Sequence, residues 1–97
     1  MERVDLPQGY KLEEVGHSQL LKRPNGYVLA VFGEGVKPEN IRRVAEADEE
    51  YLRAVKLQDK FGVLADPETV LLSSEDVREA RTRFLLALEL AYRDSDV

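Results

Sequence analysis

The chain has 97 residues, 43% hydrophobic and 34% charged, with a net charge of −5 and no cysteine. That size allows one modest core, and the composition is too apolar for a disordered chain and too charged for a membrane protein. The absence of cysteine excludes disulfides, thiol nucleophiles and thiolate metal sites, and the negative charge disfavours nonspecific binding to nucleic acid.

The distribution of apolar residues predicts a cytoplasmic protein. No run approaches the roughly 18 to 20 apolar residues that cross a bilayer. Met1 is followed by acidic and polar residues rather than by the basic and then apolar segment of a signal peptide. We therefore expect no contact with a membrane.

Three short strands are predicted between residues 10 and 32, after a lead-in over residues 1–9 that shows no periodicity. The first strand begins near Tyr10, where apolar and polar residues alternate weakly, as they do in an edge strand. Gly16 and His17 then supply a turn. We expect the three strands to form an antiparallel β-meander.

The strongest local signal is Pro24-Asn25-Gly26, which separates extended runs at 18–23 and 27–32. Proline sets φ for the first corner of a type I turn, asparagine suits the second, and glycine accepts the left-handed conformation that closes a bulged three-residue hairpin. The two runs are therefore predicted to pair antiparallel. Because the second run is apolar on both faces, we interpret it as the central strand or as a strand covered on both sides.

Residues 38–61 are predicted to form the first of two long helices, with Pro38 at its first position and Gly62 as its C-terminal stop. Its apolar stripe recurs at spacings of three and four and consists of Ile41, Val44, Ala45, Tyr51, Leu52 and Val55. Asp48 interrupts that stripe. It must therefore either reach solvent at a helix crossing or pair with an arginine.

An apolar connector is expected over residues 63–72, with a turn at Asp66-Pro67. Ser73 is placed as the N-cap of a second helix over residues 74–93, and residues 94–97 form a polar tail. The whole chain is thus predicted to be a single α+β domain in which a small three-stranded antiparallel β-meander is followed by two long antiparallel α-helices, in the order β-β-β-α-α.

The two predicted helices are longer than the predicted sheet. They span about 30 to 35 Å at 1.5 Å per residue, whereas the strands span about 20 Å. Part of the apolar helix surface therefore lacks a cover within one chain, and a homodimer with a four-helix interface across a twofold axis would supply that cover. The residues expected to form the interface are Phe84, Leu85, Leu86, Leu90 and Tyr92.

No combination of residues predicts a catalytic, cofactor-binding or metal site. The only histidine, His17, lies in a predicted turn and has no cysteine or second histidine beside it. Consecutive helical residues diverge by about 100°, so the acids at 46 and 48–50 are interpreted as a solvated face rather than as an acid/base or metal site. Binding of Mg²⁺ or Ca²⁺ by carboxylates alone stays open.

These features favour a small non-enzymatic binding or assembly module, without a cofactor, that forms a homodimer through its helical face. A further protein partner is left open. The alternative is a small regulatory protein that contacts nucleic acid through basic residues of the hairpin tip or the second helix, namely Lys22, Arg23, Arg78, Arg81 and Arg83. A third hypothesis, an enzyme with a carboxylate site, requires Asp48 and a second acid to meet in a pocket.

Overall fold

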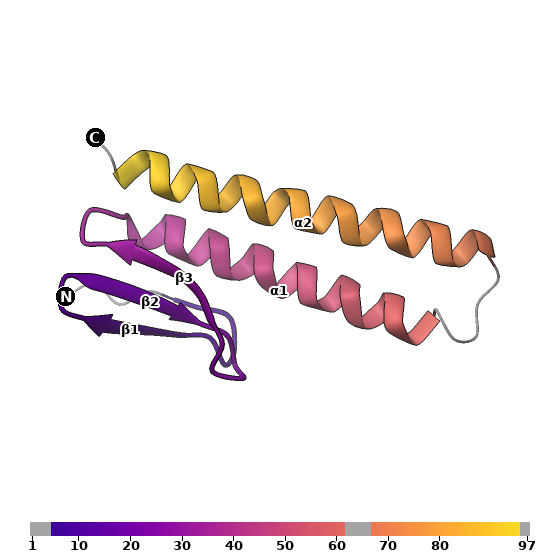
Figure 1. The fold of residues 1–97 in the computed structure, drawn as a ribbon, viewed down its shortest axis with the longest axis horizontal. Coiled ribbons are helices and arrows are strands. Elements are labelled where there is room, and N and C mark those ends of the chain that lie inside the picture. Colours follow the sequence, from indigo (N-terminus) through magenta and orange to yellow (C-terminus); the bar gives the residue numbers. More distant parts are fainter. Residues whose placement is uncertain (1–4, 62–66, 96–97) are drawn as a thin grey trace.

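Three antiparallel strands in an open sheet precede two long helices, which confirms the predicted α+β class and the order β-β-β-α-α (Figure 1). The computed structural model describes residues 5–61 and 67–95, with side-chain environments for 5–58 and 75–93. The elements are β1 (Lys11–Val15), β2 (Ser18–Lys22), β3 (Val28–Gly33), α1 (Pro38–Phe61) and α2 (Pro67–Ser95). None of the helices in this described part is long and apolar enough to cross a membrane.

The hairpin between β2 and β3 closes at the predicted turn. The backbone N–H of Gly26 donates to the carbonyl of Arg23 at 2.9 Å, and the N–H of Arg23 donates to the carbonyl of Tyr27 at 2.9 Å. Gly26 has a φ of 90°, a conformation that strains any residue with a side chain. The Asn25 side chain accepts the N–H of Tyr27 at 3.0 Å. The bulged three-residue turn is therefore confirmed.

The sheet order is β1-β2-β3, so the interpretation of the run at 27–32 as the central strand is wrong. Short hairpins join the strands, and strands joined in this way lie beside each other in chain order, which leaves β3 at an edge. Ala30 and Phe32 on β3 face the core, whereas Val28 and Val31 are exposed. The described chain therefore covers only one face of a strand that is apolar on both.

The first helix has the predicted bounds, whereas α2 begins at Pro67 rather than at Ser74 and continues to Ser95, so that residues 94 and 95 belong to the helix rather than to the predicted tail. Proline is compatible with the first helical position, and no glycine or further proline interrupts the sequence as far as Ser95. Residues 67–72 of the predicted connector are therefore helical, and Ser73 lies inside the helix rather than at its N-cap. The remaining connector residues, 63–66, lie outside the described residues.

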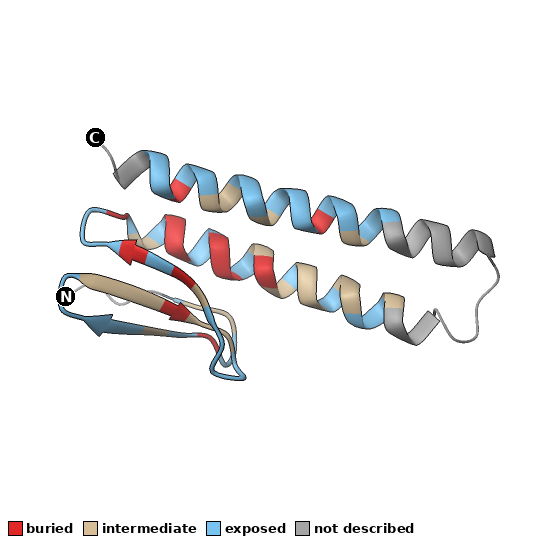
Figure 2. Cartoon of the chain, viewed as in Figure 1, coloured by how far each residue is buried: buried red, intermediate tan, exposed pale blue. Residues whose placement is uncertain are grey.

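The core lies between the inner face of the sheet and the half of the helical hairpin beside it (Figure 2). Its buried side chains are Tyr10, Leu21, Ala30, Phe32, Val36, Ile41, Val44, Ala45 and Ala91. Along α1 the last buried residue is Asp48, and every side chain from Glu49 to Gln58 is half-buried or exposed. The second half of α1 projects beyond the sheet, where α2 is its neighbour (Figure 1).

Candidate functional site

Asp48 is fully buried, and its carboxylate is paired with an arginine from the hairpin tip. Arg23 donates from Nε to Oδ2 at 2.9 Å and from Nη2 to Oδ1 at 2.7 Å, and the Tyr10 hydroxyl donates to Oδ2 at 2.7 Å. Two parallel bonds from one guanidinium are the strongest geometry for such a pair. Of the two expectations for Asp48, solvation or an arginine, the structure shows the arginine.

Tyr10 and Arg23 both keep their protons in this cluster. Burial raises the pKa of Tyr10 above its usual value, and the hydrogen bond to Asp48 raises it further. The hydrogen bond to Asp48 also raises the pKa of Arg23. Neither group releases a proton near neutral pH, so the three side chains act as a clamp that fastens the start of β1 and the hairpin tip to α1.

The acidic residues of α1 do not meet at one point. The acids at 46 and 48–50 each pair with a different arginine: Glu46 with Arg42, Asp48 with Arg23, Glu49 with Arg53, and Glu50 with Arg83. Within the described residues no group of three acidic, histidine or cysteine side chains could hold a metal ion. His17 is exposed and contacts Glu34 at 2.7 Å.

The five basic residues considered for nucleic-acid contact lie on different sides of the molecule. Arg23 binds Asp48, while Arg83 binds Glu50 at 3.3 Å. Residues 48 and 50 are about 200° apart around α1, so the two arginines approach that helix from opposite sides. Lys22 forms an ion pair with Glu13, and Arg78 and Arg81 are exposed on α2. Nucleic-acid contact stays a prediction that this dispersed arrangement does not favour.

The residues considered for self-association occupy two flanks of α2 rather than one face. Leu85 and Tyr92, seven positions apart, share one flank, and Leu86 and Leu90, four positions apart, share another. All four are substantially exposed, whereas Phe84 is half-buried against the core. An ion pair of 2.7 Å between Arg93 and Glu89 separates the two flanks.

The two flanks differ in what they already contact. The Tyr92 hydroxyl donates to the carbonyl of Val31 at 3.0 Å, and its ring lies 5.5 Å from that of Phe32. Tyr92 therefore joins α2 to the edge strand of the sheet. Leu85, Leu86 and Leu90 form no comparable contact with the core cluster, and of these Leu86 and Leu90 lie together on one flank.

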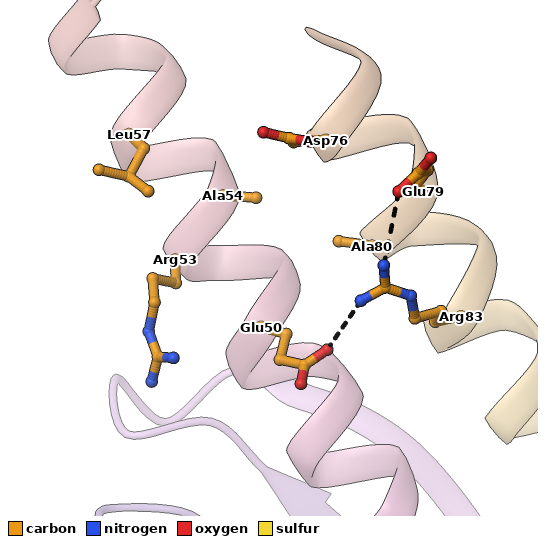
Figure 3. A pocket seen from close by; sticks show the side chains of 8 residues that line it. All are labelled: Glu50, Arg53, Ala54, Leu57, Asp76, Glu79, Ala80 and Arg83. Carbon is orange, nitrogen blue, oxygen red and sulfur yellow. Dashed lines mark hydrogen bonds and ion pairs between the residues drawn. The ribbon is translucent and has the colours of Figure 1, made fainter. Parts of the chain in front are cut away.

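A groove of about 360 Å³ lies between the helices, on the part of the hairpin beyond the sheet (Figure 3). Ala54 of α1 and Ala80 of α2 point toward each other across the groove, and Asp76 extends toward α1 (Figure 3). Arg83 bridges the helices by binding Glu50 at 3.3 Å and Glu79 at 3.5 Å. The groove is lined by Glu50, Arg53, Ala54, Leu57, Asp76, Glu79, Ala80 and Arg83.

The groove lies on the same face of α2 as Leu86 and Leu90. Residues at successive spacings of three and four follow a single seam along a helix. That seam contains Asp76, Glu79, Arg83, Leu86 and Leu90. We name this seam, together with the groove residues of α1, the groove face.

Sequence reasoning found the leucines of the groove face but missed the groove, including Leu57 and Ala54 on α1. The spacing along α2 was a signal for the seam, whereas the opposition of two alanines depends on how the helices pack. Comparisons with protein-family models, with curated proteins and with solved structures give no match. The surfaces of this chain therefore provide the grounds for a functional proposal.

Proposed function

We propose that this chain is a small protein-interaction module without catalytic activity, which forms a homodimer through its groove face. The supporting observation is surplus surface. The accessible surface is 7032 Å², whereas a compact monomer of 11.0 kDa is expected to expose about 5,600 Å². The chain thus exposes more surface than a compact domain of its mass does.

The surplus surface arises from the shape of the molecule. The chain measures 49 × 26 × 17 Å, and its radius of gyration of 15.4 Å exceeds the about 12.5 Å expected for a compact domain of this length. The length comes from the helical hairpin that projects beyond the sheet (Figure 1). On this projection Leu57 of α1 is exposed, whereas Leu86 of α2 is exposed in the half beside the sheet, between Phe84 and Leu88, which pack against the core. A partner on the projecting half would remove apolar surface from water without changing the core.

The charges of the groove face permit contact between identical chains. Although the net charge of the whole chain is −5, the groove is lined by both signs. Three acids, Glu50, Asp76 and Glu79, stand beside two arginines, Arg53 and Arg83. A mixed surface of this kind can present opposite charges to a second copy of itself, which a uniformly acidic surface cannot.

Measuring the molar mass of two matched variants tests the proposal. Leu86→Glu places a charge on the groove face, and Leu85→Glu places the same charge on the other flank, at a residue of nearly equal exposure (53% and 51%). We expect the parent chain and Leu85→Glu to have twice the chain mass by sedimentation equilibrium, and Leu86→Glu to have the mass of one chain. Circular dichroism would show that helix content is retained.

Two results would contradict the proposal. A parent chain that stays monomeric up to several hundred micromolar would exclude a stable homodimer. A parent dimer that Leu86→Glu leaves intact would exclude the groove face as the interface.

A further inference from the structure

We infer that the two copies pack α2 against α2 in antiparallel orientation, so that Leu86 and Leu90 of each protomer enter the groove of the other. This inference rests on the proposed homodimer and specifies how its interface is built. The partner is thus a second copy of this chain, and each copy supplies both the hollow and the side chains that fill it.

The positions of the groove-lining residues and of the leucines along the α2 seam support the antiparallel arrangement. The first half of the seam, with Asp76, Glu79 and Arg83, lines the groove, while the two leucines lie further along the same face. A hollow at one end and large apolar side chains at the other are complementary only when the second helix runs in the opposite direction. A twofold axis across the seam produces this arrangement and forms the same contact twice.

A parallel arrangement is disfavoured by the same residues. It would place each seam residue beside its own copy, so that Asp76 meets the partner's Asp76 and Glu79 meets the partner's Glu79. Like charges that are held side by side at an interface oppose association. The parallel arrangement would also leave both grooves unfilled.

The groove suits a leucine side chain. Its floor is formed by small residues, because Ala54 and Ala80 oppose each other (Figure 3). Leu57 also lines the groove, and the Arg83 guanidinium lies between the helices, paired with Glu50 and Glu79 (Figure 3). Side chains that fill this hollow gain the packing contacts that its lining lacks in the monomer.

The seam spacing gives the register. When antiparallel seams interdigitate, Arg83 lies beside the partner's Leu86, and Glu79 beside the partner's Leu90. One further layer brings Asp76 close to the partner's Arg93. Asp76 has no hydrogen bond or ion pair to any described residue of its own chain, and Arg93 is exposed beside Glu89. The register therefore offers Asp76 an opposite charge.

A second antiparallel register must be distinguished by experiment. In it, Leu86 packs on the partner's Leu90, so the leucines meet each other and the groove stays empty. That register places Arg83 near the partner's Arg93 and gives no role to Ala54, which lies on α1 and away from the leucine contact. Substitutions at Ala54 and at the ends of the seam therefore separate the two registers.

The first part of the test fills the groove from α1. Ala54→Leu occupies the hollow, so we expect it to raise the dimer dissociation constant at least tenfold, as measured by sedimentation velocity over a concentration series. Ala54→Ser, which adds little volume, is the matched control and should bind as the parent chain does. Thermal unfolding of each variant checks that the monomer is intact.

The second part exchanges the charges of one layer, at two exposed positions that do not belong to the core. Asp76→Arg and Arg93→Asp should each weaken the dimer about tenfold, because the twofold axis repeats the exposed ion pair and each pair contributes about threefold. The double variant should return toward the parent dissociation constant, because the opposite charges meet again. Under the second register the two positions do not meet, and the double variant would show no recovery.

The outcomes separate the inference from the proposed function. A dimeric parent chain that is insensitive to Ala54→Leu and shows no recovery in the double variant would overturn the register and leave the homodimer standing. A monomeric parent chain would overturn both. Weakening by Ala54→Leu together with recovery in the double variant would establish the groove as the receptor for the partner's leucines.

Discussion

Val44 and Val55 belong to the same apolar stripe of α1, yet Val44 has no accessible surface and Val55 is only half-buried. The sheet covers the stripe as far as Asp48 and no further (Figure 2). The helix is thus apolar over both halves but is packed as a core element over only one. The half beside the sheet therefore contains the buried part of the stripe, while the projecting half keeps apolar side chains such as Leu57 exposed.

The acidic residues of the two halves differ in the same way. Asp48, in the half beside the sheet, is buried and accepts bonds from Tyr10 and Arg23. Asp76, in the projecting half, is exposed and extends across the groove (Figure 3). A buried carboxylate contributes to folding through its partners, whereas an exposed one contributes little until a second molecule approaches.

Substitution of Asp48 and of Asp76 should give the largest difference in the free energy of unfolding. We expect Asp48→Ala to lower the free energy of unfolding by about 3 kcal/mol, because it leaves the part-buried guanidinium of Arg23 without a counter-charge and the Tyr10 hydroxyl without its acceptor. Asp76→Ala should change it by less than about 0.5 kcal/mol. Urea unfolding followed by circular dichroism measures both. Equal losses for the two variants would show that the clamp does not stabilise the monomer.

The same substitution at the two valines sharpens the comparison. Val44→Ala removes buried methyl groups and leaves a cavity, so we expect a loss of about 2 to 3 kcal/mol in unfolding free energy. Val55→Ala should cost less than about 1 kcal/mol, because its site is only half-buried. Both should be measured at concentrations where the chain is monomeric. A larger loss at Val55 would mean that the projecting half also forms a core within one chain.

A smaller effect is expected from alkaline titration. Because the pKa of Tyr10 is raised above its ordinary value of 10.0 in the folded chain, the folded state holds this proton more tightly than the unfolded state. The protonated Tyr10 hydroxyl therefore contributes fully to the free energy of unfolding below pH 10. This contribution is lost as the pH rises further, at up to about 1.4 kcal/mol per pH unit. Unfolding free energies at pH 9 and pH 10.5 should show the loss.

Tyr10→Phe provides the control for that titration, because it removes the titrating hydroxyl while Arg23 still binds Asp48. The difference in stability between pH 9 and pH 10.5 should therefore be smaller in this variant. An unchanged difference would assign the alkaline loss to other groups.

The turn and the first helix could be predicted because their signals are local. Gly26 accepts positive φ whatever surrounds it, and Pro38 suits a helix start by its own ring geometry. The start of α2 was predicted too late because Ser73 is a suitable N-cap residue. In the structure the helix already begins at Pro67, so Ser73 lies within it. The two flanks of leucines could have been separated by helical periodicity alone, since Leu85 and Leu86 differ by about 100°.

The sequence by itself determined the class of fold, the PNG hairpin, the bounds of α1 and the surplus of apolar residues on α2. Each of these follows from backbone preferences or from periodicity within a short segment. Only the tertiary structure decided that Arg23 is the partner of Asp48, that β3 lies at the edge of the sheet and that Ala54 and Ala80 leave a groove. These outcomes depend on distances between segments far apart in the chain, which no local pattern specifies.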